Sequence, residues 1–229
     1  MKNFNYSNIV KMSFGYIKKL ELVKNGDAGV DCKVYHLNNK ECIKLFNHSK
    51  DIFELKRYHE YTELDFSCAA LPKKLYLINN KFRAIKTEYV NGDMLSEINP
   101  DMEYSKYLSL SKILLEASKE ISEEGIVVYD AHSNNIMYNY DKDKFVIVDQ
   151  GEWSSNRIHS EEAKCLNFRI LNNTLRSELF DSPFSIGMLK KSLDMYDDYI
   201  DFYETEIELV EKKIGKKIIT IDEFRKAIR

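Results

Sequence analysis

The sequence has few cysteines and prolines, and each shortage excludes a class of structure. Only four cysteines occur, namely Cys32, Cys42, Cys68 and Cys165, and none forms a C-x-x-C pair or lies near histidines at zinc-site spacing. A disulfide framework and a structural zinc site are therefore not expected, and we predict reduced, mostly buried thiols. The three prolines and eight glycines form no linker, and the sequence has no internal repeat.

Long apolar runs and an excess of one charge are also missing. No stretch approaches the roughly 20 apolar residues of a transmembrane helix, and residues 1–20 lack the apolar segment of a signal peptide. We therefore expect a cytoplasmic protein. The 34 basic and 37 acidic residues are interspersed and give a formal net charge of −3, so neither nucleic acid nor a membrane is expected as a partner.

The composition is that of an ordinary globular protein. Of the 229 residues, 44% are hydrophobic and 31% are charged, which excludes a largely disordered chain. This length can bury a core and is compatible with one domain or with two small lobes.

Short β-type runs dominate the first part of the chain. The turn-prone pairs Asn38-Asn39 and Asn79-Asn80 join neighbouring runs and predict hairpins. The expected strands are residues 18–23, 33–37, 41–46, 73–78 and 82–90.

Helical periodicity appears once among these strands and dominates after Gly92. Ser49 or Asp51 can cap the first helix, Gly125 suits the end of the second, and Thr220 with Glu223 forms a T-x-x-E capping box before the last. The expected helices are residues 49–64, 101–124, 160–180, 184–213 and 221–228.

One stretch carries the chemistry: VVYDAHSNNIMYNYDKDKFVIVDQGEW, residues 127–153. Its two apolar runs predict a hairpin, which brings Asn135 at the start of one strand near Asp149 at the end of the other. Their amide and carboxylate oxygens are hard ligands that suit Mg²⁺. Asp130 precedes Asn135 by five residues and can face a ligand that is bound to the metal ion.

The pattern D-x-x-x-x-N followed by D-x-G is similar to the catalytic and metal-binding loops of the protein-kinase-like superfamily. The form D-A-H-S-N-N resembles the aminoglycoside and choline kinase branch and atypical bacterial kinases. This resemblance implies an α+β, two-lobed fold in which residues 1–229 form one kinase-like domain. The N-lobe, about 1–91, would be a small antiparallel β-sheet carrying one helix, and the C-lobe, about 92–229, would be mainly helical.

The resemblance also implies a lysine and a glutamate in the N-lobe. Lys44, in E-C-I-K-L-F, would bind the α- and β-phosphates of ATP. Glu54 is the preferred partner of Lys44 because it borders the apolar face of the predicted helix, and Glu60 is the alternative. In the hinge-like run T-E-Y-V-N-G, backbone groups around Glu88 to Val90 would bind adenine.

The phosphate loop is less regular than in most kinases. K-N-G-D-A-G-V-D-C-K-V-Y keeps Gly26, Gly29 and Val34, but Cys32 stands where a third glycine is common. The residues before Asp130 are Val-Tyr rather than His-Arg, and no A-P-E follows. Regulation by activation-loop phosphorylation is accordingly disfavoured.

The function expected from these motifs is transfer of the γ-phosphate of ATP to a hydroxyl, with Mg²⁺ held by Asn135 and Asp149. Asp130 would orient or deprotonate the acceptor. His132 is expected to bond the loop backbone, with a direct role in the active site as the alternative. The expected acceptor is Ser or Thr of a protein; the alternatives are an aminoglycoside, choline or sugar hydroxyl, and a pseudokinase scaffold that binds nucleotide without turnover.

Overall fold

The computed structural model of the chain describes residues 6–23, 31–154, 156–180 and 199–228. The fold is α+β, as predicted, and it forms two compact units, Met1–Val90 and Asn91–Arg229. Gly26 and Gly29 of the expected phosphate loop lie outside the described residues, as does the first part of the helix expected over 184–213.

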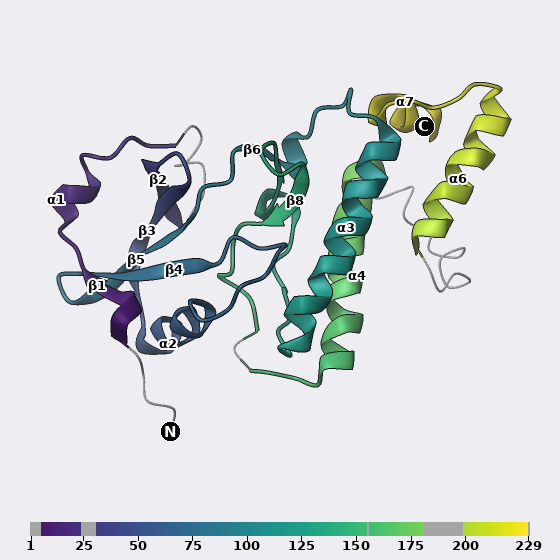
Figure 1. The fold of residues 1–229 in the computed structure, drawn as a ribbon. Coiled ribbons are helices and arrows are strands. Elements are labelled where there is room, and N and C mark those ends of the chain that lie inside the picture. Colours follow the sequence, from purple (N-terminus) through teal and green to yellow (C-terminus); the bar gives the residue numbers. More distant parts are fainter. Residues whose placement is uncertain (1–5, 24–30, 155, 181–198, 229) are drawn as a thin grey trace. The chain divides into compact units, whose positions relative to one another are not determined.

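The first unit is built on a five-stranded sheet, seen with its helices in Figure 1. The strand order is β1-β4-β5-β3-β2, in which β1 pairs parallel with β4 and all other pairs are antiparallel. The strands are β1 (Ile9–Lys11), β2 (Cys32–Asn38), β3 (Glu41–Lys50), β4 (Pro72–Ile78) and β5 (Lys81–Glu88).

The fifth strand of this sheet is not the one expected from the sequence. The strand predicted over 18–23 is wrong, because Lys18 ends the short helix α1 (Phe14–Ile17) and only Leu22 forms an isolated bridge, to Tyr35. The fifth strand is instead β1, which follows the short 3-10 helix η1 (Tyr6–Asn8) and pairs with β4 at the edge of the sheet opposite β2. Three residues are too few to show a period of two, so the pattern could not indicate β1.

The predicted turn and helix of this unit are confirmed. Asn79 and Asn80 have φ angles of 53° and 58°, as the two central residues of a type I′ hairpin turn require. Helix α2 (Ile52–Tyr61) is capped by Asp51, whose side chain accepts from the amide of Glu54 at 2.8 Å. It is shorter than the expected 49–64 because its cap lies at Asp51 rather than Ser49.

The two faces of β3 pack against different parts of the unit. Ile43 and Leu45 face the cluster that contains Ile17. Since neighbouring residues of a strand point to opposite faces, Lys44 and Phe46 face the other side, where the Phe46 ring lies 5.7 Å from the Tyr58 ring of α2. Lys44 therefore shares the α2 face of the sheet.

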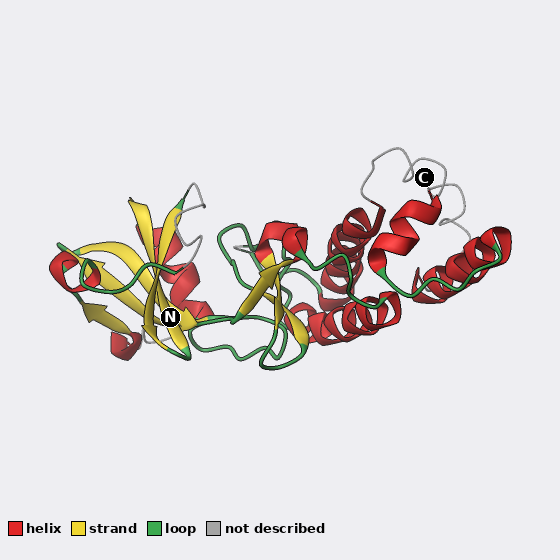
Figure 2. Ribbon diagram, turned by 90° about the horizontal axis from the view of Figure 1, so that it is seen from above, coloured by secondary structure: helices red, strands yellow, loops and turns green. Residues whose placement is uncertain are grey.

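The second unit contains a three-stranded sheet and the longer helices, which Figure 2 shows as yellow strands and red coils. The predicted hairpin is confirmed as β7 and β8, and a third strand, β6, pairs with β7. The elements are β6 (Gly92–Met94), η2 (Leu95–Glu97), α3 (Tyr104–Glu123), η3 (Ser133–Asn135), β7 (Ile136–Asn139), β8 (Lys144–Ile147), α4 (Ser160–Phe180), α6 (Tyr199–Ile214) and α7 (Ile221–Ile228).

Helices α3 and α4 lie side by side (Figure 1), and the Tyr107 hydroxyl of α3 donates to the Leu175 carbonyl of α4 at 2.7 Å. Helix α3 is followed by its C-cap Glu124 and then, as predicted, by Gly125, which has a φ of 68° that favours glycine. The capping box before α7 is also confirmed, because the amide of Glu223 donates to the Thr220 hydroxyl at 3.2 Å. No helix in the described ranges is long and apolar enough to cross a membrane.

Gly92 allows β6 to approach β7 closely. A Cβ atom at this position would lie 1.7 Å from the Tyr138 carbonyl oxygen. We predict that Gly92→Ala lowers the free energy of unfolding by about 2 kcal/mol, because β6 must move away from β7. Gly15→Ala is the control, since nothing lies within 4 Å of a Cβ there. Calorimetric unfolding measures both variants, and equal stability of the two would contradict the prediction.

Candidate active site

In the first unit, the structure buries the lysine that the motif singled out. The Lys44 side chain lies on the α2 face of β3 with only 9% of its surface exposed. In the sheet register Lys44 stands between Val34 of β2 and Ile85 of β5. This buried position on β3 is compatible with the phosphate-binding role that the resemblance implies for Lys44.

The expected partner of Lys44 is not Glu54 in this structure. With Asp51 as the N-cap, Glu54 is the third residue of α2, and its carboxylate accepts from the Asp51 amide at 3.1 Å to complete a capping box. Its other oxygen lies 3.1 Å from the ammonium of Lys50, the last residue of β3. The side chain of Glu60 is exposed, and within the described residues neither glutamate contacts Lys44.

The signal for this different role was present in the sequence. D-I-F-E, residues 51–54, has the D-x-x-E spacing of a capping box. The sequence analysis left the cap open between Ser49 and Asp51, and only a cap at Asp51 gives Glu54 this structural role.

The hinge-like run follows directly from β5. The Glu88 carbonyl accepts a hydrogen bond from the Cys42 thiol at 3.6 Å, and the Tyr89 amide donates to the Lys40 carbonyl at 2.9 Å. Val90 is buried, and no residue in the described part of the chain accepts a hydrogen bond from its amide. An N–H group in that position is suited to a ligand with a hydrogen-bond acceptor.

The Cys42 thiol beside Lys44 is protected by its burial. Burial raises the pKa of the Cys42 thiol to about 11, so the reactive thiolate is rare near neutral pH. At about pH 8, where an unperturbed thiol of pKa about 8.5 is partly ionised, we predict that iodoacetamide alkylates exposed Cys165 and leaves Cys42 unmodified. Mass spectrometry of tryptic peptides measures this, and equal labelling of the two cysteines would contradict the burial of Cys42.

In the second unit, Asn135 links the residues of the D-x-x-x-x-N motif. Its amide nitrogen Nδ2 donates to the Asp130 carboxylate at 3.0 Å and to the Asp130 carbonyl at 2.9 Å. Asp130 keeps 38% of its side chain exposed. The carboxylate is thus held by the loop and remains accessible to solvent.

The backbone of Asn135 places Asp149 in the same region. The Asn135 carbonyl accepts from the Val148 amide at 2.9 Å, which extends the β7–β8 pairing to the residue before Asp149. Asp149 accepts from the Gly151 amide at 3.0 Å, so its carboxylate is oriented by its own turn. The hairpin therefore brings together Asp130, Asn135 and Asp149.

The side-chain oxygen of Asn135 can serve a metal. Both hydrogen bonds from Asn135 to Asp130 use Nδ2, and Oδ1 has no hydrogen bond within the described residues. Those residues contain no group of three His, Cys, Asp or Glu side chains that could hold a metal ion. Mg²⁺ nevertheless needs only one or two protein ligands when water and phosphate oxygens complete its octahedron, and Asn135 with Asp149 fits that requirement.

His132 bonds the loop backbone, as the preferred interpretation expected. Its Nδ1 atom accepts from the Asn134 amide at 3.2 Å and so caps η3. Its Nε2 atom lies 3.5 Å from the nearer carboxylate oxygen of Asp130 and 3.1 Å from Asn135 Nδ2. The ring is half exposed, and its contacts orient the loop.

Asn167 of α4 is a supporting residue that the sequence analysis missed. This fully buried side chain accepts from the Val128 amide at 2.9 Å and donates to the Ile126 carbonyl at 2.8 Å and to the Ser122 hydroxyl at 2.9 Å. One asparagine thereby satisfies buried backbone groups on both sides of Val127. The only sign of this supporting role in the sequence is that an asparagine lies inside a predicted helix, where this residue type is unfavourable.

Thr174 holds the other side of the same loop. It lies two turns beyond Asn167 on α4, and its hydroxyl donates to the Ala131 carbonyl at 2.6 Å. Val128 and Ala131 flank the two residues Tyr129 and Asp130, so α4 fixes the backbone on each side of the carboxylate.

No protein-family model matches the chain, and no curated protein is similar enough to it to be a relative. The candidate site therefore depends on the residues and contacts described above.

Proposed function

We propose that the protein is an ATP- and Mg²⁺-dependent phosphotransferase with a two-lobed, protein-kinase-like fold. The strongest support comes from two hydrogen bonds of Asn135. Its Nδ2 atom donates to the Asp130 carboxylate, and its carbonyl accepts from the Val148 amide, directly before Asp149. A carboxylate close to the acceptor and two oxygen ligands close to the phosphates are what phosphoryl transfer to a hydroxyl requires.

The proposed roles divide between binding and proton transfer. Asp130 orients the acceptor hydroxyl and takes its proton, while Asn135 Oδ1 and the Asp149 carboxylate hold Mg²⁺. The bound ion would neutralise charge on the phosphate oxygens. The buried ammonium of Lys44 binds the α- and β-phosphates.

The remaining nucleotide contacts in this proposal come from the backbone. The amide of Val90 and its neighbours from Glu88 onward bind adenine, and the loop containing Gly26 and Gly29 covers the phosphates beside Val34. The acceptor we propose is a Ser or Thr hydroxyl of a protein, as the resemblance to atypical bacterial kinases implies.

The test is to incubate γ-labelled ATP and Mg²⁺ with the protein and a cell lysate, and then to separate proteins from small molecules. Label that appears in protein and depends on the added chain supports the proposal, and Asp149→Asn should remove it because a metal ligand is lost. Label confined to the small-molecule fraction would identify a small-molecule kinase. No transfer, combined with a rise in melting temperature on adding ATP, would identify a nucleotide-binding scaffold instead.

A further inference from the structure

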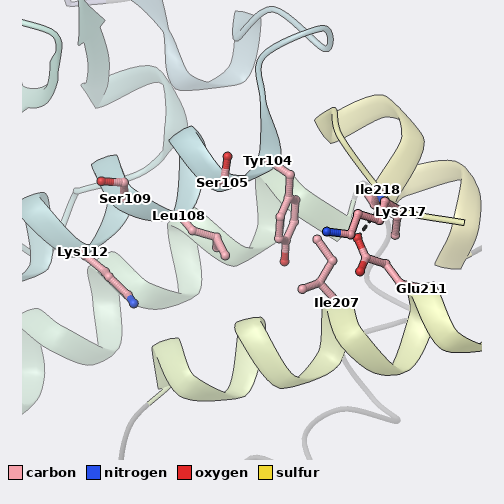
Figure 3. Close-up of a pocket in the computed structure, with 9 residues that line it drawn as sticks. All are labelled: Tyr104, Ser105, Leu108, Ser109, Lys112, Ile207, Glu211, Lys217 and Ile218. Atoms are coloured by element: carbon pink, nitrogen blue, oxygen red, sulfur yellow. Dashed lines mark hydrogen bonds between the residues drawn. The ribbon is translucent and has the colours of Figure 1, made fainter.

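A pocket in the second unit lies between α3, α6 and the segment that leads into α7. Its volume is about 490 Å³, within the range of about 300 to 1,000 Å³ that is usual for small-molecule sites. Figure 3 shows the nine lining residues, which are Tyr104, Ser105, Leu108, Ser109, Lys112, Ile207, Glu211, Lys217 and Ile218.

The apolar part of this pocket is firmly built. Tyr104, Leu108 and Ile218 are all buried, and the Tyr104 ring packs at 4.6 Å from the Phe224 ring of α7. Ile207 adds an aliphatic surface from α6 (Figure 3). These side chains form an apolar floor at the bottom of the pocket.

The polar groups around this floor include two serine hydroxyls, which can donate or accept hydrogen bonds, and two lysine ammonium groups, which only donate. Ser105, Ser109 and Lys112 follow one line along α3, at positions i, i+4 and i+7. Lys112 extends into the pocket from one side and Lys217 from the other (Figure 3). Among the described residues, Lys217 has neither a hydrogen bond nor an ion pair.

Glu211, the acidic residue among the described lining residues, already has a role in the fold. One carboxylate oxygen of Glu211 accepts from the Ile218 amide at 2.7 Å, which fixes the turn between α6 and α7. Among the described lining residues, the Lys217 ammonium group thus has no acidic partner. Its charge favours a ligand that brings hydrogen-bond acceptors and negative charge.

We propose that this pocket binds a small organic anion, with an apolar body over Tyr104 and Leu108 and a carboxylate or phosphate group at Lys217. The proposal concerns a site formed within the second unit alone. It does not depend on phosphotransferase activity, so either proposal can fail without the other.

The test measures binding of matched probes to the full chain by saturation-transfer NMR and titration calorimetry. The anionic probes are phenylbutyrate and phenyl phosphate, and the matched neutral and cationic probes are phenylbutyramide and phenylbutylamine. We expect binding of at least one anion and at least about tenfold weaker binding of the neutral and cationic probes. Whichever anion binds more tightly identifies the preferred head group.

Variants locate the site on the protein. Lys217→Glu should weaken binding of the anion by about tenfold or more, and Leu108→Trp should block it by filling the pocket. Lys213→Glu is the matched control, because this exposed lysine lies on α6 but does not line the pocket. Absence of binding, equal binding of the neutral probe, or equal losses in the Lys217 and Lys213 variants would overturn the proposal.

Discussion

Replacing Asp130 with asparagine is expected to lower the rate of phosphate transfer by about 100- to 10,000-fold, the usual contribution of a general acid or base. An asparagine side chain keeps an oxygen that can accept from Asn135 Nδ2, so the hydrogen bond that measures 3.0 Å in the unmodified protein can still form. What is lost is the negative charge that accepts the proton. Binding of ATP, measured as a rise in melting temperature, should therefore remain unchanged.

Asp141→Asn is the matched control for this experiment. The Asp141 carboxylate also accepts from an asparagine amide, that of Asn91 at 3.1 Å, but it is exposed on the turn between β7 and β8. The control should retain the full rate of transfer. Equal rates for Asp130→Asn and the unmodified protein would remove Asp130 from the proposed mechanism.

Asn167→Leu is expected to cause the largest loss of stability in the second unit. The leucine has a similar volume but leaves the Val128 amide and the Ile126 carbonyl without a partner. At about 1 to 3 kcal/mol for each buried group, the free energy of unfolding should fall by about 2 to 6 kcal/mol. Trp153 is the single tryptophan and is buried in this unit, so its fluorescence during urea unfolding reports the change.

The control for this change is Asn173→Leu, an exposed position on the same helix. Its effect should stay within about 0.5 kcal/mol, as for most surface substitutions. If both variants unfold at the same urea concentration, then the hydrogen bonds of Asn167 contribute little, and α4 does not hold the loop in the way described.

The sequence was sufficient to predict most of the regular elements and the hairpin at the candidate site. Asn79-Asn80, the cap at Thr220 and the glycine at the end of α3 are local signals, since each is determined by backbone geometry within a few residues. The approach of Asn135 to Asp149 was predictable for the same reason. A hairpin with a defined turn fixes which residues of its strands are opposite each other.

Contacts between distant segments were not predictable in this way. Strand β1 exists because three residues pair with β4 more than 60 positions later, and no local period marks it. Asn167 accepts a hydrogen bond from the amide of Val128, which lies about 40 residues earlier in the chain. The partner of Glu54 was misjudged for a different reason, because a capping role and a catalytic role both explain a glutamate near the start of a helix.

The asymmetric side chain of Asn135 explains why an amide, rather than a second carboxylate, is needed next to Asp130. Its donor end meets Asp130 at 3.0 Å while its oxygen is left for another ligand. An aspartate in its place would have no N–H group to donate to Asp130 and would set two carboxylates at that distance. The asparagine thus gives Asp130 a hydrogen-bond donor and leaves an oxygen for another ligand, without placing a second negative charge in the loop.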